Sequence, residues 1–445
     1  MKRNRGHSGG RQANGVHGGG GGGQKGEAKK AITERQVAEF TQEWGALAQE
    51  EVSSADYYFN SYAHFGIHEE MLKDSVRTGT YQKAILQNAH LFRGKTVLDV
   101  GSGSGILSLF AAKAGAKKVY GIECSEIVEI ARQIIAYNNY DDVVEFITGK
   151  AEEVTLPVDK VDIIVSEWMG YFLLYESMLD SVLFCRDKWL KEGGLIFPDK
   201  ASLYLSGIED ADYREEKLGQ WHNVYGFDFS PVKAIVMEDP LVDNVQAGVM
   251  NTTSCQILSL DLNTCKKDDA DFASRFSIRA LRRDFIHALV AWFDVTFSCR
   301  DVPHSHSVSF TTAPFSKWTH WKQTVFYLKD ALVAHEGEEV SGLIAVRKNA
   351  KNPRDLDIKL KYVFDGAAAI AAVGGEGERE ETENVVGGNE PNGAAGMDLE
   401  EEEGDQAGGE EAAAGKQKEK KNAAQRERGS GQGTGVNETL FFRLR

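Results

Sequence analysis

Two glutamates flank an apolar stretch of the sequence. In SEWMGYFLLYE, Glu167 and Glu176 lie at the ends of a run that is otherwise almost entirely apolar or aromatic. A buried carboxylate without a partner is unfavourable, and a second carboxylate nearby makes ionisation more costly still. The pair therefore indicates that a cation lies between the two side chains. That cation need not belong to the protein.

A glycine-rich segment upstream has the pattern of a ligand-binding turn. VLDVGSGSGIL reads as a strand, a turn and a helix start, with Asp99 just before Gly101 and Gly103. We expect these three residues to contact the ligand. Glycines at such a turn let a ligand approach the backbone closely. Glu123 ends the next strand, where a carboxylate can accept hydrogen bonds from both hydroxyls of a ribose. Glu152 follows the third strand, in a position to accept from the exocyclic amine of adenine.

The residues around this turn favour a ligand without phosphates. The turn contains neither a lysine followed by serine or threonine nor any other basic residue, and Asp99 has the wrong charge for a pyrophosphate. An adenosine that carries an amino acid fits better, and this describes S-adenosylmethionine. The alternative is a glycine-rich turn that only allows tight packing between the strand and the helix.

The order of the predicted elements indicates two different domains. Apolar strand candidates alternate with helical segments, which predicts a parallel, doubly wound, Rossmann-like sheet of the α/β class. These strands are expected at 95–101, 118–124, 143–149 and 160–168. After residue 199 the pattern changes to short alternating strands, which predict an antiparallel barrel or sandwich. A more helical segment with aromatic residues, 211–245, interrupts that series.

The composition places two long segments outside the fold. The chain has 445 residues and a net charge of -16, but residues 1–30 are basic and glycine-rich, and 366–436 are dominated by acidic runs. Both segments hold too few large apolar residues to offset the entropy of ordering, so we expect disorder. The strand candidates KLKYVFD and TLFFRLR flank the acidic segment, and we predict that they pair. The domains would then be 31–198 and 199–365 with 437–445; an unrelated terminal tail is the alternative.

Cysteine usage and hydropathy bear on the compartment. The five cysteines have no CxxC or Cys/His spacing, which predicts free thiols and no metal site. The basic N-terminus runs into glycine rather than into an apolar segment, and no stretch approaches eighteen uncharged apolar residues. We expect a protein of the nucleus and cytoplasm without a membrane span.

Five motifs in order resemble one enzyme family. YFNSYAHFGIHEEMLKDSVRT, VLDVGSGSGIL, GIEC, SEWMGYFLLYESML and WTHWKQTVFYL together resemble the protein arginine methyltransferases, most closely the type I enzymes that produce asymmetric dimethylarginine. The resemblance implies a β-barrel as the second domain and S-adenosylmethionine as the methyl donor. It also implies Arg/Gly-rich RNA-binding proteins and histone tails as substrates, without direct binding of nucleic acid. The segment 211–245 resembles the family's dimerisation arm, which implies a homodimer.

The same resemblance assigns roles to further residues. His68, Met71 and Arg77 match positions that contact the cofactor, and Tyr58 and Tyr62 match aromatic residues that close over the site. Met178, together with Met71, matches methionines that line the methyl-transfer site. His320 matches a histidine that pairs with an acid on the N-terminal helix, here Asp74.

Elementary chemistry supports a role for the two glutamates in such a reaction. A guanidinium has a pKa above about 12 and is a poor nucleophile, because its lone pairs are delocalised into the cation. Glu167 and Glu176 could grip it and draw its charge onto the bonded nitrogens, so that the remaining terminal nitrogen keeps more lone-pair density. Orientation and electrostatic preorganisation would supply much of the acceleration.

Other interpretations of these residues remain open. Glu167 and Glu176 could pair with arginines of this chain. A small-molecule methyltransferase would share the cofactor domain but would need neither the two acids nor a barrel. A non-catalytic scaffold that binds S-adenosylmethionine and Arg/Gly-rich proteins would be expected to have lost one glutamate, and both are present. The arginines of RNRGHSGGRQ near the N-terminus also lie in a substrate-like setting, so automethylation there is a further hypothesis.

Overall fold

The computed structural model describes residues 64–364, 366 and 436–445. All of them belong to one compact unit that spans 53–445. The predicted N-terminal tail, the first part of the predicted domain 31–198, and nearly all of the acidic insertion fall outside the described residues. The predictions for those segments therefore stay predictions.

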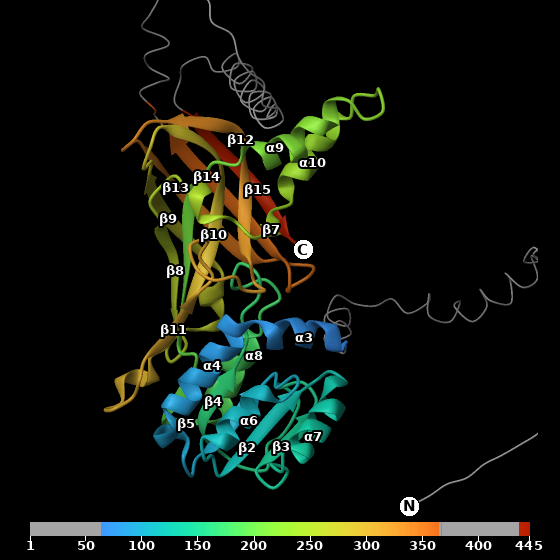
Figure 1. The fold of residues 1–445 in the computed structure, drawn as a ribbon, viewed down its shortest axis with the longest axis vertical. Coiled ribbons are helices and arrows are strands. Elements are labelled where there is room, and N and C mark those ends of the chain that lie inside the picture. Colours follow the sequence, from blue (N-terminus) through green and yellow to red (C-terminus); the bar gives the residue numbers. More distant parts are fainter. Residues whose placement is uncertain (1–63, 365, 367–435) are drawn as a thin grey trace, which may run out of the picture. The chain divides into compact units, whose positions relative to one another are not determined.

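The first domain contains a five-stranded sheet in which every neighbouring pair of strands is parallel (Figure 1). The strand order is β3-β2-β1-β4-β5. The strands are β1 Thr96–Val100, β2 Lys118–Glu123, β3 Val144–Thr148, β4 Val161–Ser166 and β5 Leu190–Phe197. The predicted strands therefore form, with ends that differ by one or two residues, and the predicted Rossmann-like sheet is confirmed.

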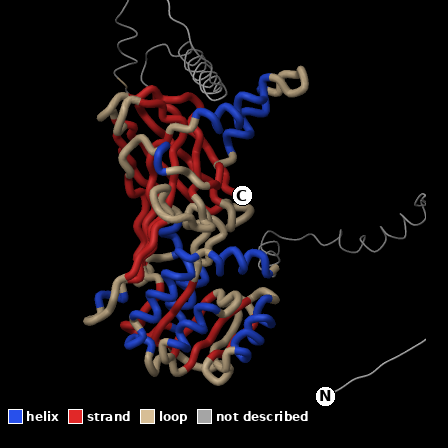
Figure 2. The backbone as a smooth tube through the Cα atoms, in the orientation of Figure 1, coloured by secondary structure: helices blue, strands red, loops and turns tan. Residues whose placement is uncertain are grey.

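Helices flank this sheet (Figure 2). α6 packs on β1, β2 and β3, whereas α8 packs on β1, β4 and β5. Because helices cover both faces of the sheet, β1 and β4 are almost entirely buried. The helices of this domain are α3 Phe65–Lys73, α4 Ser75–Gln87, α5 Ala89–Phe92, α6 Ile106–Lys113, α7 Ile127–Tyr137 and α8 Leu179–Trp189.

The strand order places the end of β1 next to the end of β4. These neighbouring strands lie where the connections change direction: β1 leads towards β2, and β4 leads towards β5. Ligands of open α/β sheets bind outside the carboxyl ends of the strands at such a point. Gly101 follows β1 and Glu167 follows β4, so the fold brings the glycine turn and the first glutamate of the apolar stretch to one place.

The second domain consists of two antiparallel sheets. One has the order β7-β12-β10-β6-β8, with β11 paired to β10, and the other has the order β15-β14-β13-β9. β8 also contacts β9, which joins the two sheets along one side in a barrel-like arrangement. The strands are β6 Lys200–Ile208, β7 Leu241–Asp243, β8 Cys255–Asp261, β9 Phe272–Arg279, β10 Asp284–Phe297, β11 Val308–Thr311, β12 Gln323–Ala334, β13 Glu339–Lys348, β14 Leu356–Phe364 and β15 Val436–Leu444.

The last strand confirms the predicted pairing across the acidic insertion. β14 and β15 are antiparallel, from Leu356 opposite Leu444 to Phe364 opposite Val436. β15 begins at Val436, one residue earlier than predicted. Residues 365–435 thus connect two adjacent strands. A longer connection adds only about 0.6 kcal/mol of closure cost for each doubling of its length, so the hairpin tolerates it.

The segment 211–245 contains short helices and then returns to the barrel. Its elements are α9 Ala211–Leu218, the 3-10 helices η2 Gly219–His222 and η3 Ser230–Val232, α10 Lys233–Glu238, and finally β7. Neither α9 nor α10 has a buried side chain. Tyr225 is 98% exposed and Phe227 is 70% exposed. Trp221 is partly buried, and its indole Nε1–H donates to the Lys217 carbonyl oxygen at 2.7 Å.

Three further 3-10 helices complete the described elements: η4 Ala247–Val249, η5 Lys267–Ala270 and η6 Cys299–Asp301. All five cysteines are free thiols, as predicted. Across the described residues, no helix combines the length and the apolar character that a membrane span requires.

Candidate active site

A cavity of about 420 Å³ lies at the carboxyl ends of the parallel strands. Most of the predicted site residues line it: His68, Met71, Arg77, Gly101, Gly103, Glu123, Glu152, Glu167, Glu176 and Met178. Asp74, Asp99 and His320 do not line it. Tyr58 and Tyr62 fall outside the described residues. The structure thus gathers residues from distant parts of the chain around one space.

The glycine turn approaches its neighbours too closely for larger residues. Gly101 and Gly103 have φ values of 71° and 51°, which glycine adopts without strain. A Cβ atom on Gly101 would lie 2.4 Å from Cε of Met178, and one on Gly103 would lie 3.1 Å from Cε1 of His68. The turn therefore leaves room at the cavity wall only because it is built from glycine.

Glu123 is held rigidly at the end of β2. Its Oε1 accepts hydrogen bonds from the N–H groups of Cys124 and Ser125 and from the Ser125 hydroxyl, at 2.8–2.9 Å. Its Oε2 accepts one, from the Gly103 N–H, at 2.7 Å. An oxygen with two lone pairs and three donors has no capacity left. Oε2 can accept once more, so the predicted contact with a ribose rests on this single atom.

Asp99 faces away from the cavity, contrary to the prediction that it contacts the ligand. It is 1% exposed, and its Oδ2 accepts a hydrogen bond of 2.7 Å from the Ser108 hydroxyl on α6. Successive side chains of a strand point to opposite faces, and this position of β1 points towards the helix. Burial raises the pKa of Asp99 to about 7, with Ser108 opposing the rise and the charge of Glu123 adding to it.

This raised pKa predicts a pH-dependent stability. A carboxyl group whose pKa is higher in the folded than in the unfolded state destabilises the fold as pH rises from about 4 to about 7. As pH rises from 4 to 8, the free energy of unfolding of Asp99→Asn should increase relative to that of the parent by up to about 4 kcal/mol. Each unit of difference in pKa corresponds to about 1.4 kcal/mol. Urea unfolding of both proteins across this range measures the difference.

Asp162 on the same sheet offers a matched control of opposite sign. Hydrogen bonds from Lys191 and Thr96 outweigh its burial and lower its pKa. A lowered pKa contributes stability that is present above the unfolded-state value and is lost only at lower pH. Asp162→Asn should therefore be less stable than the parent by the same amount from pH 5 to pH 8. A pH-independent difference for Asp99→Asn would contradict the prediction.

The apolar side chains between the two glutamates anchor a hairpin-like loop after β4. Trp168, Phe172 and Leu173 are almost fully buried. The N–H of Met178 donates to the Trp168 carbonyl oxygen at 2.9 Å, which ties the two ends of the loop together. A Cβ atom on Gly170 would lie 1.6 Å from the Tyr175 carbonyl oxygen, so the loop requires glycine there. Burial of the apolar residues thus fixes the positions of the acids at either end.

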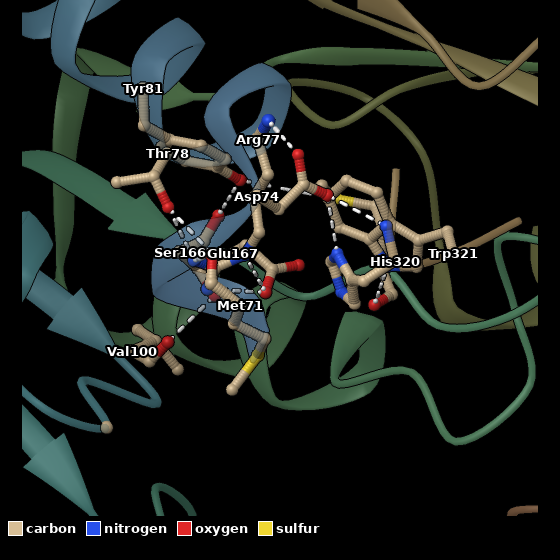
Figure 3. A network of polar contacts seen from close by, with 12 residues as sticks. Met71, Asp74, Arg77, Thr78, Tyr81, Val100, Ser166, Glu167, His320 and Trp321 are labelled. Atoms are coloured by element: carbon tan, nitrogen blue, oxygen red, sulfur yellow. Dashed lines mark hydrogen bonds and ion pairs between the residues drawn. The ribbon is translucent and has the colours of Figure 1, made fainter. Parts of the chain in front are cut away.

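Arg77 engages only one oxygen of Glu167 (Figure 3). Its Nε and Nη2 atoms lie 2.9 and 2.8 Å from Glu167 Oε2. Oε1 of Glu167 is buried and has no hydrogen-bond partner among the described residues. The alternative interpretation, that the two glutamates pair with arginines of this chain, is therefore correct for Glu167. The pairing leaves one carboxylate oxygen at the cavity in need of a donor.

Glu176 lies at the other end of the loop in a strained backbone conformation. Its φ is 53°, which is unusual for a residue with a side chain, and its N–H donates to the Arg354 carbonyl oxygen at 3.0 Å. Burial raises the pKa of Glu176; the Arg354 charge and the Tyr175 hydroxyl oppose the rise, and Asp355 adds to it. A cation bound beside Glu176 would stabilise its charged form.

Asp74 joins the N-terminal helices to the barrel (Figure 3). It is fully buried, and its Oδ1 caps α4 by accepting from the N–H groups of Val76 and Arg77, each at 3.0 Å. Its Oδ2 accepts from the His320 N–H at 2.9 Å and lies 2.8 Å from His320 Nδ1. Burial would raise the pKa of Asp74, but the hydrogen bonds from His320 and Arg77 outweigh it and lower the pKa. The predicted contact between Asp74 and His320 is confirmed.

Curated relatives match the chain over nearly their whole length. Protein arginine N-methyltransferase 1 of Chlamydomonas reinhardtii is 58% identical over 321 residues, which cover 72% of this chain and 92% of the relative. The enzyme of the same name from Schizosaccharomyces pombe is 57% identical over 314 residues, covering 71% of this chain and 91% of the relative. The chain belongs to the protein arginine methyltransferase family.

Family models and solved structures agree with membership of the protein arginine methyltransferases. A model of the arginine methyltransferase oligomerization subdomain matches residues 199–367, and one of ribosomal protein L11 methyltransferase matches 83–183. The Trypanosoma brucei PRMT1 enzyme-prozyme heterotetrameric complex with AdoHcy is 47% identical, with a TM-score of 0.67, over 69% of this chain and 96% of that chain. Arabidopsis thaliana protein arginine methyltransferase 10 is 32% identical, with a TM-score of 0.65, over 70% and 96%.

Recognition of the arginine methyltransferase family from the sequence motifs is thereby confirmed. The comparisons also confirm two further predictions: a Rossmann-like domain followed by a β-barrel, and an enzyme of type I that depends on S-adenosylmethionine. The roles given to individual residues are not tested by these relatives. They stay predictions. Among the residues that the structure describes, the positions of all but Asp99 suit the predicted roles.

The cavity of this arginine methyltransferase also contains residues that the sequence analysis missed. Arg354 lines it from the loop between β13 and β14. Asp180 lies between two lysines that also line the cavity, with Lys348 Nζ at 2.6 Å and Lys267 Nζ at 3.0 Å from its carboxylate oxygens. For Arg354, the sequence offers only the turn-rich run NAKNPRDLD. This run predicts a loop, but it does not predict that the loop reaches the cavity.

The cavity has features that fit S-adenosylmethionine. The glycine turn exposes backbone, Glu123 Oε2 retains an acceptor position, and Ser102 Oγ is buried at the cavity wall without a hydrogen-bond partner in the described part of the chain. Glu152 also lines the cavity, where its Oε1 accepts from the Ser181 hydroxyl at 2.7 Å. These groups match the adenosine and amino-acid portions of the molecule in polarity.

Proposed function

We propose that this chain methylates the terminal guanidino nitrogens of arginine in Arg/Gly-rich proteins and histone tails, giving mono- and asymmetric dimethylarginine. One observation carries the proposal: Glu167 Oε1 is buried at the cavity and lacks a hydrogen-bond donor among the described residues. A guanidinium is the donor that fits, because it is planar, charged and rich in N–H groups.

Within the group formed by Glu167, Glu176 and Arg77, two carboxylates face one cation, so the group holds one negative charge in excess. Arg77 neutralises one of the two glutamates through Glu167 Oε2. The second negative charge remains at the cavity that both glutamates line, and the buried Glu167 Oε1 has no donor among the described residues. A substrate guanidinium supplies the missing charge, and its N–H groups satisfy the buried oxygen.

The two glutamates polarise the substrate and hold it in place. When they accept hydrogen bonds from two guanidino nitrogens, positive charge is drawn to those nitrogens, and the third keeps more lone-pair density. Bound S-adenosylmethionine supplies an electrophilic methyl group on a sulfonium. His68, Met71, Gly101, Gly103 and the free lone pair of Glu123 Oε2 are the groups that would hold it. Arg77 also donates to the Met71 carbonyl oxygen at 3.2 Å, which ties the helix α3 to the carboxylate it orients.

Other hydrogen bonds fix the loop between Glu167 and Glu176 relative to α4 and to the barrel. The Tyr81 hydroxyl donates to the Ser166 carbonyl oxygen at 2.8 Å, and the Trp321 indole N–H donates to the Met169 carbonyl oxygen at 3.1 Å. These bonds reach the loop from α4 and from the barrel. We therefore assign Asp74 and His320 a positioning role, since they join α4 to the same barrel segment and do not line the cavity.

An assay of product identity tests the proposal. The purified chain is incubated with labelled S-adenosylmethionine and an Arg-Gly-Gly peptide, a histone-tail peptide, or the same peptides with every arginine replaced by lysine. We expect mono- and asymmetric dimethylarginine from the first two and no label in the lysine peptides. Symmetric dimethylarginine, or labelled lysine, would contradict the proposal.

We also propose that the chain acts as a homodimer through the segment 211–245. The support is its exposed apolar surface, which includes Tyr225, Phe227 and Ile235, 61% exposed, together with the match of 199–367 to an oligomerization subdomain. Solvent-exposed aromatic side chains on a protruding segment are typical of an interface. Nuclear and cytoplasmic location, and the absence of direct nucleic-acid binding, remain predictions.

Charge at this surface is expected to break the dimer. For Tyr225→Glu/Phe227→Glu we expect a monomer in sedimentation and a loss of about tenfold or more in kcat/KM, because a buried unpaired carboxylate disfavours association. Leu281→Glu is the control, since Leu281 is 54% exposed in a different part of the barrel. A fully active monomer would refute the link between dimer and activity.

A further inference from the structure

The outer face of the sheet β15-β14-β13-β9 is basic. Alternate residues of these strands are buried against the barrel core, and the others face outwards. The outward positions hold six cations, Arg275, Arg279, Arg347, Lys359, Lys361 and Arg443, and two acids, Glu339 and Asp357. This face therefore carries four positive charges in excess, whereas the whole chain has a net charge of -16. We call this surface the basic face.

The two acids of the basic face are already neutralised. Glu339 pairs with Arg279 at 2.6 Å, and Asp357 lies 2.9 Å from Arg443 and 3.5 Å from Arg347. The remaining cations have no carboxylate partner among the described residues: these are Arg275, Lys359 and Lys361. Lys359 lies over the ring of Phe441, with its Nζ 5.4 Å from the centroid.

The unpaired cations surround an apolar spot. The strand register places Leu343 directly between Arg275 and Lys361, and Leu343 is 48% exposed. A hollow of about 610 Å³ lies here, lined among others by these three residues and by Ser277 and Val363. A ligand for this surface should combine several negative charges with a few apolar side chains.

A segment of this chain has that chemistry and is attached to the same sheet. The connection between β14 and β15 includes MDLEEEEGD, residues 397–405, in which Met397 and Leu399 accompany six acids. Residues 365–397 separate Phe364 from Asp398, and a chain of that length spans up to about 110 Å when extended. Four strands are only about 15 Å across, so every part of the basic face is within reach.

We propose that residues 397–405 dock on the basic face of their own chain. Tethering at both ends gives the segment an effective concentration of about a millimolar, so weak charge pairing suffices. The active-site cavity is a poorer partner for an acidic segment. It contains Glu167 and Glu176, and its three lysines already pair with carboxylates: Lys150 with Glu153, and Lys267 and Lys348 with Asp180.

Carbodiimide cross-linking of the full-length chain tests this docking. The reagent joins a carboxylate to a lysine amine in contact with it, and mass spectrometry identifies the pair. We expect cross-links from 397–405 to Lys359 and Lys361 at a yield about tenfold or more above those to Lys83 and Lys113, which are exposed on α4 and α6. About 0.5 M salt should remove the preference, because screening shortens the reach of exposed charges.

Two variants and an isotope mixture make the test specific. Arg275→Glu/Arg347→Glu keeps both reporter lysines but reverses charge on the basic face, and should lower the Lys359 and Lys361 yield about tenfold. Arg93→Glu/Lys117→Glu, an equal change of charge at exposed residues of the other domain, should not. In a mixture of ¹⁵N-labelled and unlabelled protein, the cross-linked pairs should carry a single isotope.

Three results would overturn the proposal. Equal yields at all exposed lysines would mean that the segment has no docking site. A preference for Lys267 and Lys348 would place the segment at the active-site cavity instead. Cross-links between labelled and unlabelled peptides would mean that the basic face binds the acidic segment of a second copy.

Discussion

Glu167→Gln is expected to lower kcat/KM by about 1,000-fold, which is the upper range for loss of one preorganised electrostatic contact. Glutamine keeps the shape of the side chain but removes its charge. Arg77, 8% exposed at its side chain, would then be buried without a counter-ion, and the substrate guanidinium would meet one carboxylate instead of two. The net charge of Glu167, Glu176 and Arg77 together would become one unit more positive, which disfavours binding of a cationic substrate.

Steady-state kinetics with an Arg-Gly-Gly peptide measure this loss. Calorimetric binding of S-adenosylmethionine is measured in parallel, and we expect Glu167→Gln to bind it within a few-fold of the parent, because the contacts assigned to it lie mainly on the glycine turn and Glu123. The control is Glu145→Gln, at an exposed position on β3, which should keep parental activity. Parental kcat/KM for Glu167→Gln would refute the assignment.

Asp74→Ala is expected to destabilise the folded chain by about 3–5 kcal/mol, because it removes a buried charge that accepts several hydrogen bonds. The substitution leaves the N–H groups of Val76, Arg77 and His320 without their acceptor. It also frees the His320 side chain, which Asp74 Oδ2 holds at 2.8 Å. Since α4 carries Arg77, activity should fall together with stability.

Urea unfolding at neutral pH measures the change in stability. Asp141→Ala, at an exposed turn between α7 and β3, serves as the matched control and should change the free energy of unfolding by less than about 0.5 kcal/mol. A parental unfolding curve for Asp74→Ala would mean that the junction between α4 and the barrel does not depend on this carboxylate.

Short-range patterns allowed much of the fold and site to be predicted. The strands of the parallel sheet follow from apolar runs between glycine turns, and the pairing of β14 with β15 follows from matched alternation on either side of the insertion. Glu167 and Glu176 could be recognised because a carboxylate in an apolar stretch needs an explanation. Each of these inferences rested on a pattern within one or two short segments of the sequence.

What the sequence analysis missed depends on contacts that only the folded chain creates. Whether Asp99 faces the cavity or α6 depends on where α6 places Ser108. Arg354 reaches the cavity because its backbone meets that of Glu176, 178 positions earlier in the sequence. Local periodicity contains no information about such distant partners.

The most direct test of the two-carboxylate account is single-turnover methyl transfer from labelled S-adenosylmethionine to an Arg-Gly-Gly peptide by the parent and by Glu176→Gln, after both have been shown to bind the cofactor. The account predicts monomethylarginine from the parent, because a single turnover transfers one methyl group, and a rate at least about 100-fold lower from the variant, despite comparable cofactor binding. An equal rate in the two proteins would show that Glu176 does not polarise the guanidinium, and would contradict the account.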